Sequence, residues 1–127
     1  LYATPPTFNC YLANKMFTWI EQQGGVHALY AQNQQKAMRL YHYIDASSFY
    51  TCSVKKEHRS LFNVCFNLPD VALENVFVEE AKNRQLLSLR GHRLVGGLRA
   101  SLYNAMPMVG VEALLAFMHD FYEEHRQ

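Results

Sequence analysis

The stretch from residue 60 to residue 68 constrains the fold most, because it alternates with the period of a β-strand. Apolar side chains at every second position are interleaved with polar or small ones, in the order Phe62, Asn63, Val64, Cys65, Phe66, Asn67, Leu68. A period of two places successive side chains on opposite faces of a strand. We therefore predict a strand here, with the aromatic and aliphatic residues sharing one face.

Most other apolar residues follow helical spacing. A first helix is predicted after Pro5-Pro6, with one face formed by Phe8, Tyr11, Leu12, Lys15, Met16, Trp19 and Ile20. After Gly24-Gly25, a second helix is predicted from about Val26 to Ile44, with candidate buried residues Leu29, Tyr30, Met38, Leu40 and Tyr41. Pro69-Asp70 opens a third helix, which carries Leu73, Val76, Phe77, Val78 and Ala81 and could extend to Leu86. The last runs from Met108 to Arg126, with Val111, Leu114, Leu115, Met118, Phe121 and Tyr122 inward.

Between the third and last helices, the chain is expected to form two short extended pieces around Gly91 and Gly96-Gly97. The predicted order is therefore α-α-β-α-β-β-α. Few strands and several helices indicate an α+β fold, with a small, mainly antiparallel sheet covered by helices. The 127 residues suit one domain. Nothing ties the leading helix to the sheet, so it could belong to a neighbouring layer.

Composition excludes several classes of function. The formal charge of +1 provides no field for nucleic acid, and no apolar run reaches the ~20 residues of a membrane span. The cysteines Cys10, Cys52 and Cys65 lack the spacing of a zinc site, so we expect no metal and reduced, mostly buried thiols in a cytoplasmic protein. No lysine lies in a sequence context that would desolvate it into a nucleophile.

The segment from Arg90 to Pro107 is the strongest candidate for chemistry. Arg90, His92, Arg93 and Arg99 surround a Gly-Gly pair. Guanidinium groups bind carboxylates and phosphates through fixed forks of donors, and glycine lets another group approach the backbone closely. The segment is therefore a candidate site for a small dianion. The alternative is a strand whose cations face solvent, and for any single arginine this alternative is favoured.

The same segment resembles a known signature. The pattern from Gly91 to Ala105, Gly-His-Arg-x-x-Gly-Gly-x-Arg-Ala-Ser-x-Tyr-Asn-Ala, is similar to the C-terminal motif of the phosphoserine aminotransferase family. This family is a branch of the class V, fold-type I aminotransferases that depend on pyridoxal phosphate. The opening Thr4-Pro5-Pro6-Thr7-Phe8 and the stretch Asn33-Gln34-Gln35-Lys36-Ala37 also fit, so the resemblance covers essentially the whole chain.

The resemblance implies a reaction and its site residues. A homodimeric enzyme would transfer an amino group between glutamate and 3-phosphohydroxypyruvate, giving O-phospho-L-serine and 2-oxoglutarate in serine biosynthesis, and would also act in pyridoxine biosynthesis in bacteria. Arg99 matches the arginine that binds the substrate α-carboxylate. His92 and Arg93 match residues that bind the phosphate or side-chain carboxylate across the dimer interface. Thr4 matches a contact to the phosphate of pyridoxal phosphate, while Ala3 stands where the family usually has Asn.

The resemblance also implies that catalytic parts lie elsewhere. The family's Schiff-base lysine lies upstream of this segment, so the segment alone is expected to be inactive. Residues 1–127 would be the C-terminal aminotransferase domain, with 1–24 the tail of the large cofactor domain and a linking helix; the missing initiator Met fits a start inside a longer protein. The alternative functions are a stand-alone domain that binds a phosphorylated metabolite and a dimerisation domain without catalysis.

Overall fold

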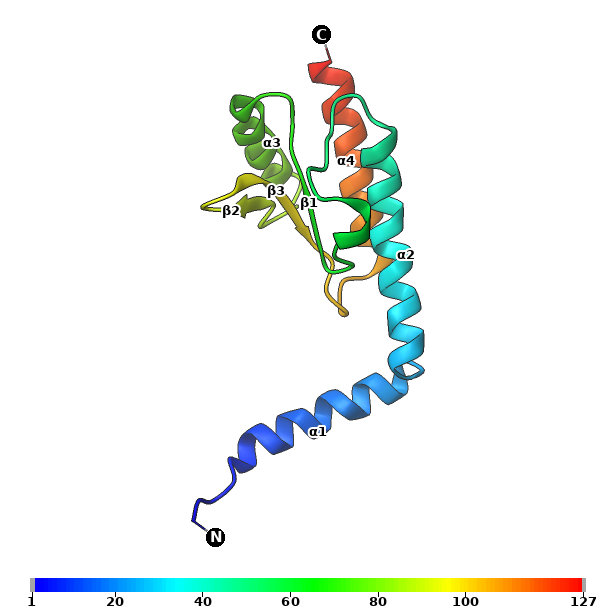
Figure 1. The fold of residues 1–127 in the computed structure, drawn as a ribbon, viewed down its shortest axis with the longest axis vertical. Coiled ribbons are helices and arrows are strands. Elements are labelled where there is room, and N and C mark those ends of the chain that lie inside the picture. Colours follow the sequence, from blue (N-terminus) through cyan, green and yellow to red (C-terminus); the bar gives the residue numbers. More distant parts are fainter. Residues whose placement is uncertain (1, 127) are drawn as a thin grey trace. The chain divides into compact units, whose positions relative to one another are not determined.

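A computed structural model describes residues 2–126, so Leu1 and Gln127, the two ends of the predicted domain, lie outside the described residues. The elements follow the predicted order α-α-β-α-β-β-α, with one short 3-10 helix added (Figure 1). Their bounds are α1 Thr7–Gln22, α2 Gly25–Ala46, η1 Lys56–His58, β1 Asn63–Phe66, α3 Val71–Asn83, β2 Arg90–His92, β3 Gly96–Ser101 and α4 Met108–His125. The predicted α+β class is confirmed.

The chain divides into two compact units, Leu1–Gln32 and Asn33–Gln127. The first unit contains α1, whose predicted helical character is confirmed although none of its residues is buried. The apolar residues Phe8, Tyr11, Leu12 and Met16 are exposed over more than half of their surface. The apolar face predicted for this helix is therefore largely exposed, and only Trp19 and Ile20 at its end are half-buried.

The second unit is built on a three-stranded antiparallel sheet with the strand order β1-β3-β2 (Figure 1). The central strand β3 pairs with β1 in the register Val64 to Ala100 and Cys65 to Arg99. It pairs with β2 in the register Arg90 to Leu98. β2 and β3 are joined by a tight hairpin, and α3 connects β1 to β2.

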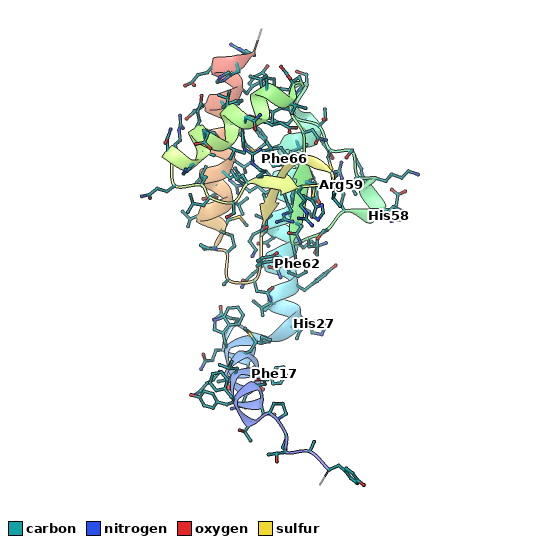
Figure 2. All side chains as sticks on the ribbon, turned by 90° about the vertical axis from the view of Figure 1, so that its left-hand side faces the viewer. Phe17, His27, His58, Arg59, Phe62 and Phe66 are labelled. Atoms are coloured by element: carbon teal, nitrogen blue, oxygen red, sulfur yellow. The ribbon has the colours of Figure 1, made fainter. Side chains whose placement is uncertain are left out.

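One face of this sheet is buried against helices, and the core lies there. Val64 and Phe66 of β1 and Leu98 and Ala100 of β3 are almost completely buried. The helices contribute buried residues from α2, α3 and α4, namely Ala37, Leu40, Tyr41, Ile44, Phe77, Ala81, Val111, Leu114, Phe117, Met118 and Phe121. Figure 2 labels Phe66 on the sheet strand that these helices cover.

Phe77 of α3 is at the centre of an aromatic cluster. Its ring centroid lies 4.7 Å from that of Phe117, 5.0 Å from that of Phe121 and 6.0 Å from that of Phe66. Two of these three pairs are edge-to-face, the arrangement that the ring quadrupoles favour. The Tyr50 ring joins the cluster, and its hydroxyl donates a 2.8 Å hydrogen bond to the carbonyl of Met118. Sheet and helices are thus held by one continuous set of rings.

Several predicted core residues are exposed instead. Tyr30, Met38, Phe62 and Val76 are each exposed over about 40% of their surface or more, whereas Phe117 is buried without having been predicted. Successive residues on a helix point about 100° apart, so Val76 and Phe77 cannot both face the sheet. Phe62 precedes β1 and lies in a bend, outside the strand alternation.

The cysteines are also less buried than predicted. All three are free thiols, as expected, but Cys10 and Cys65 are exposed and Cys52 is half-buried. Cys10 lies on the uncovered helix α1, and Cys65 alternates with Val64 and Phe66 onto the opposite face of the sheet. The expectation of mostly buried thiols was therefore wrong.

An arginine anchors the segment that leads into β1. The Arg59 guanidinium donates two hydrogen bonds to the Asp45 carboxylate, at 2.7 and 2.8 Å, and its Nε donates to the carbonyl of Val54. These hydrogen bonds lower the pKa of Asp45. Arg59 also lies over the ring of Tyr41, 4.7 Å from its centroid, and Figure 2 labels it beside His58. The nitrogens of this guanidinium are therefore hydrogen-bonded within the chain and its face is stacked on a ring, so its role is structural.

Among the described residues, no helix combines the length and apolar character needed to cross a membrane.

The neighbouring residues Phe77 and Val76 provide a matched test of this packing. Phe77→Ala should destabilise the domain by about 3–5 kcal/mol, because it opens a cavity at the centre of the ring cluster. Val76→Ala, on the exposed side of the same helix, should cost less than about 1 kcal/mol. Urea denaturation of the chain and the two variants measures both values. Equal losses would contradict the assignment of Phe77 to the core.

Candidate functional site

Arg99 lies on β3, on the face of the sheet that the helices do not cover. Its neighbours Leu98 and Ala100 point into the core, so the alternation of the strand directs Arg99 to the opposite side. Its backbone N–H donates a 2.7 Å hydrogen bond to the carbonyl of Leu89, which fixes the strand at this residue. The side chain is half-buried.

The Arg99 guanidinium lacks the partners that a structural arginine has. Its Nε is buried without a hydrogen-bond partner, and no carboxylate among residues 2–126 forms an ion pair with it. Arg59, by contrast, donates to a carboxylate and to a carbonyl. A buried polar group without a partner costs roughly 1–3 kcal/mol, and more when it is charged. Arg99 therefore has unused capacity to bind an anion.

The surroundings of Arg99 on this face are small and polar. Cys65 of β1 is its direct cross-strand partner, so both side chains point the same way. Asn63 and Ser101 form the next pair along the ladder, and the Ser101 hydroxyl donates to the Asn63 amide oxygen at 3.3 Å. We call Asn63, Cys65, Arg99 and Ser101 the open face. This face offers a cation among hydrogen-bonding groups, with no carboxylate.

Two glycines let the three strands close around β3. Gly97 has a positive φ of 69°, and a Cβ there would overlap the Asn67 side-chain oxygen. A Cβ on Gly91 would overlap the carbonyl oxygen of Gly96 on the facing strand. The overlap at Gly91 is with backbone and leaves no room for a side chain, whereas at Gly97 the Asn67 side chain would have to move. The glycines that the sequence motif contains therefore serve the backbone geometry beside Arg99.

His92 and Arg93 lie at the exposed tip of the β2–β3 hairpin. The turn is closed by a hydrogen bond from the N–H of Val95 to the carbonyl of His92, at 2.9 Å. The Nδ1 atom of His92 accepts a hydrogen bond from the N–H of Leu94, which leaves Nε2 available as a donor. Arg93, Leu94 and Val95 are exposed. A basic and apolar tip thus projects from the sheet.

The predicted cations are distributed over different places. Arg90 pairs with Leu98 in the ladder and so lies on the helix side of the sheet, where it donates to the Asn75 side chain of α3 at 3.0 Å. His92 pairs with Gly96, which places it on the same side as Arg90. Arg99 is the one member of the predicted set on the open face. The four cations are close in sequence, but they do not form a single site in the structure.

Thr4 lies in the other unit, in the exposed segment before α1. Its hydroxyl and backbone N–H are donors of the kind that bind phosphate. Pro5 and Pro6 have no N–H, and Ala3 has no polar side chain. The residues present therefore fit the phosphate end of pyridoxal phosphate, with a single side-chain contact.

One of the lysines is buried. Lys36 of α2 is only 3% exposed, and burial lowers its pKa. Its Nζ atom donates to the carbonyls of Tyr103 and Met106, so the ammonium group is held by the backbone and is not free to act as a nucleophile. The other lysines, Lys15, Lys55, Lys56 and Lys82, are exposed.

Sequence reasoning missed the polar neighbours of Arg99, although a signal was available. Asn63 and Cys65 alternate with Val64 and Phe66, which identifies the polar face of β1. What the sequence lacks is the register that sets Cys65 opposite Arg99, since the two strands are separated by a helix. The burial of Lys36 had no local signal, because its partners lie 67 and 70 residues away.

Comparison with known sequences gives one family. The sequence model of the family described as aminotransferase class-V matches residues 2–114. A phosphoserine aminotransferase from Legionella pneumophila is 57% identical over 125 residues, which cover 98% of this chain and 34% of that protein. This chain thus spans about a third of the length of the curated relatives it matches.

Solved structures of phosphoserine aminotransferases are also similar to this chain. The phosphoserine aminotransferase from Bacillus circulans subsp. alkalophilus superposes with a TM-score of 0.91 at 42% identity, covering 97% of this chain and 34% of that one. The phosphoserine aminotransferase from Trichomonas vaginalis, solved with bound PLP, superposes with a TM-score of 0.84 at 43% identity, covering 94% of this chain and 34% of that one.

The glycine pair before Arg99 allows a matched test of the close strand approach. Gly96→Ala should cost about 1 kcal/mol, because Gly96 has a φ of 79° but open space around it. Gly97→Ala should cost a further 1–3 kcal/mol, roughly, since the methyl group overlaps Asn67. Thermal unfolding of both variants measures the difference. If Gly97→Ala is no worse than Gly96→Ala, the strands do not need this contact.

Proposed function

The chain belongs to the aminotransferase class-V family, and on this premise we propose that it is the C-terminal part of an enzyme with phosphoserine aminotransferase activity. The enzyme would transfer an amino group between glutamate and 3-phosphohydroxypyruvate, giving O-phospho-L-serine and 2-oxoglutarate. This assigns it to serine biosynthesis, with a related role in pyridoxine biosynthesis if its source is bacterial. The identity to phosphoserine aminotransferases across nearly the whole chain supports the proposal.

The observation that carries the proposal is the uncompensated guanidinium of Arg99 on the open face. Every substrate of the reaction has an α-carboxylate, and a guanidinium fork matches its two oxygens. Arg99 has a buried Nε without a partner and no neighbouring carboxylate, so a bound substrate would supply the missing negative charge. In this proposal, Arg99 holds and orients the amino or keto acid.

The second anionic group of the substrate would be bound by the hairpin tip. His92 can donate from Nε2, and Arg93 provides an exposed cation. Phosphate and the side-chain carboxylate of glutamate are both anions that such donors accept. Because His92 lies on the side of the sheet opposite to the open face that carries Arg99, we propose that the tip serves the active site of the partner subunit in a homodimer.

Thr4 would contribute to the binding of pyridoxal phosphate through its hydroxyl and N–H. The cofactor, when bound, acts as an electron sink for the carbanion formed on the substrate. The Schiff-base lysine would come from upstream, since the buried Lys36 is held by two carbonyls and the remaining lysines of this chain are exposed. The chain alone is accordingly expected to bind and orient substrate but not to convert it. We place the enzyme in the cytoplasm, where its substrates are made.

Arg99→Ala in the full-length protein tests the carboxylate role. Loss of a charge-assisted bidentate contact should cost about 2–4 kcal/mol of transition-state binding, or roughly 30- to 1000-fold in kcat/KM. Both glutamate and O-phospho-L-serine should be affected, because both carry the α-carboxylate. Arg39→Ala, which removes an exposed arginine paired with Glu112, is the control and should stay near the wild-type value. Near-wild-type turnover in Arg99→Ala would refute the role.

Arg93→Ala tests the phosphate role separately. It should lower kcat/KM for O-phospho-L-serine by about 10- to 100-fold, the value of one charge-assisted hydrogen bond. Any turnover of L-alanine, which has no side-chain anion, should change by less than about threefold. Steady-state assays with both substrates give the ratio. Equal losses for both substrates would exclude Arg93 from phosphate binding.

A further inference from the structure

Two segments that lie far apart in the sequence meet in the second unit. One is the turn Tyr103–Met106, which follows β3 and leads through Pro107 into α4. The other is the part of α2 that carries Asn33 and Lys36, one helical turn apart. The turn includes the last residues of the sequence motif that also contains Arg99. The proposed function uses Arg99 but leaves the end of that motif unexplained.

Lys36 binds both ends of this turn from inside. Its Nζ atom donates to the carbonyl oxygens of Tyr103 and Met106, each at 3.0 Å. The carbonyl of Tyr103 also accepts the 2.9 Å hydrogen bond from the N–H of Met106 that closes the turn. The ammonium group is therefore held by the first and last residues of a four-residue turn, while the side chains of that turn are exposed.

Asn33 binds the middle of the same turn. Its Nδ2 donates to the side-chain oxygen of Asn104 at 2.6 Å, and Asn33 is only 3% exposed. Its Oδ1 is buried without a partner. Together, Asn33 and Lys36 contact the turn at three points, and we call this pair the α2 clamp.

Burying the ammonium group of the α2 clamp has a free-energy cost that a purely structural contact would not need. Lys36 forms no ion pair with any carboxylate among the described residues, so only carbonyl dipoles offset its desolvation, and burial lowers its pKa. A leucine or methionine could fill such a position without that cost. A buried cation is useful where a segment of backbone must be held in one place, because an ammonium group binds several carbonyls at once.

We propose that Lys36 and Asn33 are positioning residues, which fix the exit of β3 and thereby the orientation of Arg99. The inference rests on the proposed function, in which Arg99 binds the substrate carboxylate. Arg99 lies two residues before the end of β3, and the clamped turn begins two residues after that end. The core helix α2 thus holds the turn on one side of Arg99, while the ladder to β1 and β2 holds the strand itself.

Lys36→Met in the full-length enzyme tests the proposal, since methionine keeps the length of the side chain and removes its donors. Displacement of a binding group by about 1 Å lowers efficiency by up to about 100-fold, so the KM for glutamate should rise roughly 10- to 100-fold. The kcat should change much less. Loss of folded enzyme alone would lower the apparent kcat and leave KM unchanged. The control is Lys82→Met, which removes an exposed lysine of α3. An unchanged KM in folded Lys36→Met would overturn the proposal.

A double-mutant cycle keeps the test decisive if Lys36→Met fails to fold. Asn33→Ala and Asn104→Ala each remove one side of the same hydrogen bond, so each should raise KM. The double variant should be no worse than the more affected single variant. Single effects that multiply in the double variant, or no effect of either, would overturn the proposal.

Hydrogen exchange of the turn separates this inference from the proposed function. Backbone amides of residues 102–106 should exchange about tenfold faster or more in Lys36→Met or Asn33→Ala than in the wild type, with the β1–β3 ladder unchanged. If the wild-type protein shows no transamination, the proposed function fails, yet faster exchange in the turn would still support the clamp. Unchanged exchange in both variants would refute the clamp whatever the activity.

Discussion

The second unit depends on the burial of one face of a three-stranded sheet. The rings of Phe66, Phe77, Phe117 and Phe121 join β1 to α3 and α4 in one cluster. Since alternate residues of a strand point to opposite sides, this burial also decides which residues remain on the open face. A slip of one residue in β3 would turn Arg99 into the core. The composition of the open face is thus a consequence of the packing on the other side of the sheet.

The sequence was sufficient to predict the helices and strands and their order, because the apolar residues of each element repeat with the spacing of a helix or a strand. The strand at Val64 and Phe66 alternates, and the helix at Phe77 follows helical spacing. Local spacing was insufficient where the outcome depends on distant partners. Val76 and Phe77 are both apolar, so the sequence alone does not show which of them is buried. The position of the sheet relative to the helix determines that Phe77 is buried. In the sequence, Lys36 looks like an ordinary exposed lysine of a helix. It is buried because the turn that begins at Tyr103 packs against it in the folded chain.

At the candidate site, too, the sequence predicted the residue types but not their arrangement in space. The residue types around Gly96-Gly97 indicated an anion-binding segment, and the resemblance supplied roles for Arg99, His92 and Arg93. The sequence did not reveal that the strand period separates these cations. Arg90 donates a hydrogen bond to Asn75 on the helix side of the sheet. His92 ends β2 on that same side, and Arg93 lies in the exposed turn that follows. Closeness in sequence predicts a shared element, whereas a shared site requires a shared face.

Arg59 and Arg99 show how a structure separates two uses of one side chain. Arg59 precedes the sheet, and its guanidinium is neutralised by Asp45, capped by the carbonyl of Val54 and stacked on Tyr41. An anion would have to displace these contacts to bind there. Arg99 has a fixed backbone and a buried Nε without a partner. The strand is held on both sides and the charge is left unpaired, so the free energy of binding an anion is not consumed by rearranging the protein. This combination of a hydrogen-bonded backbone and an unsatisfied cation is why we propose Arg99, and not Arg59, as the arginine that binds the substrate.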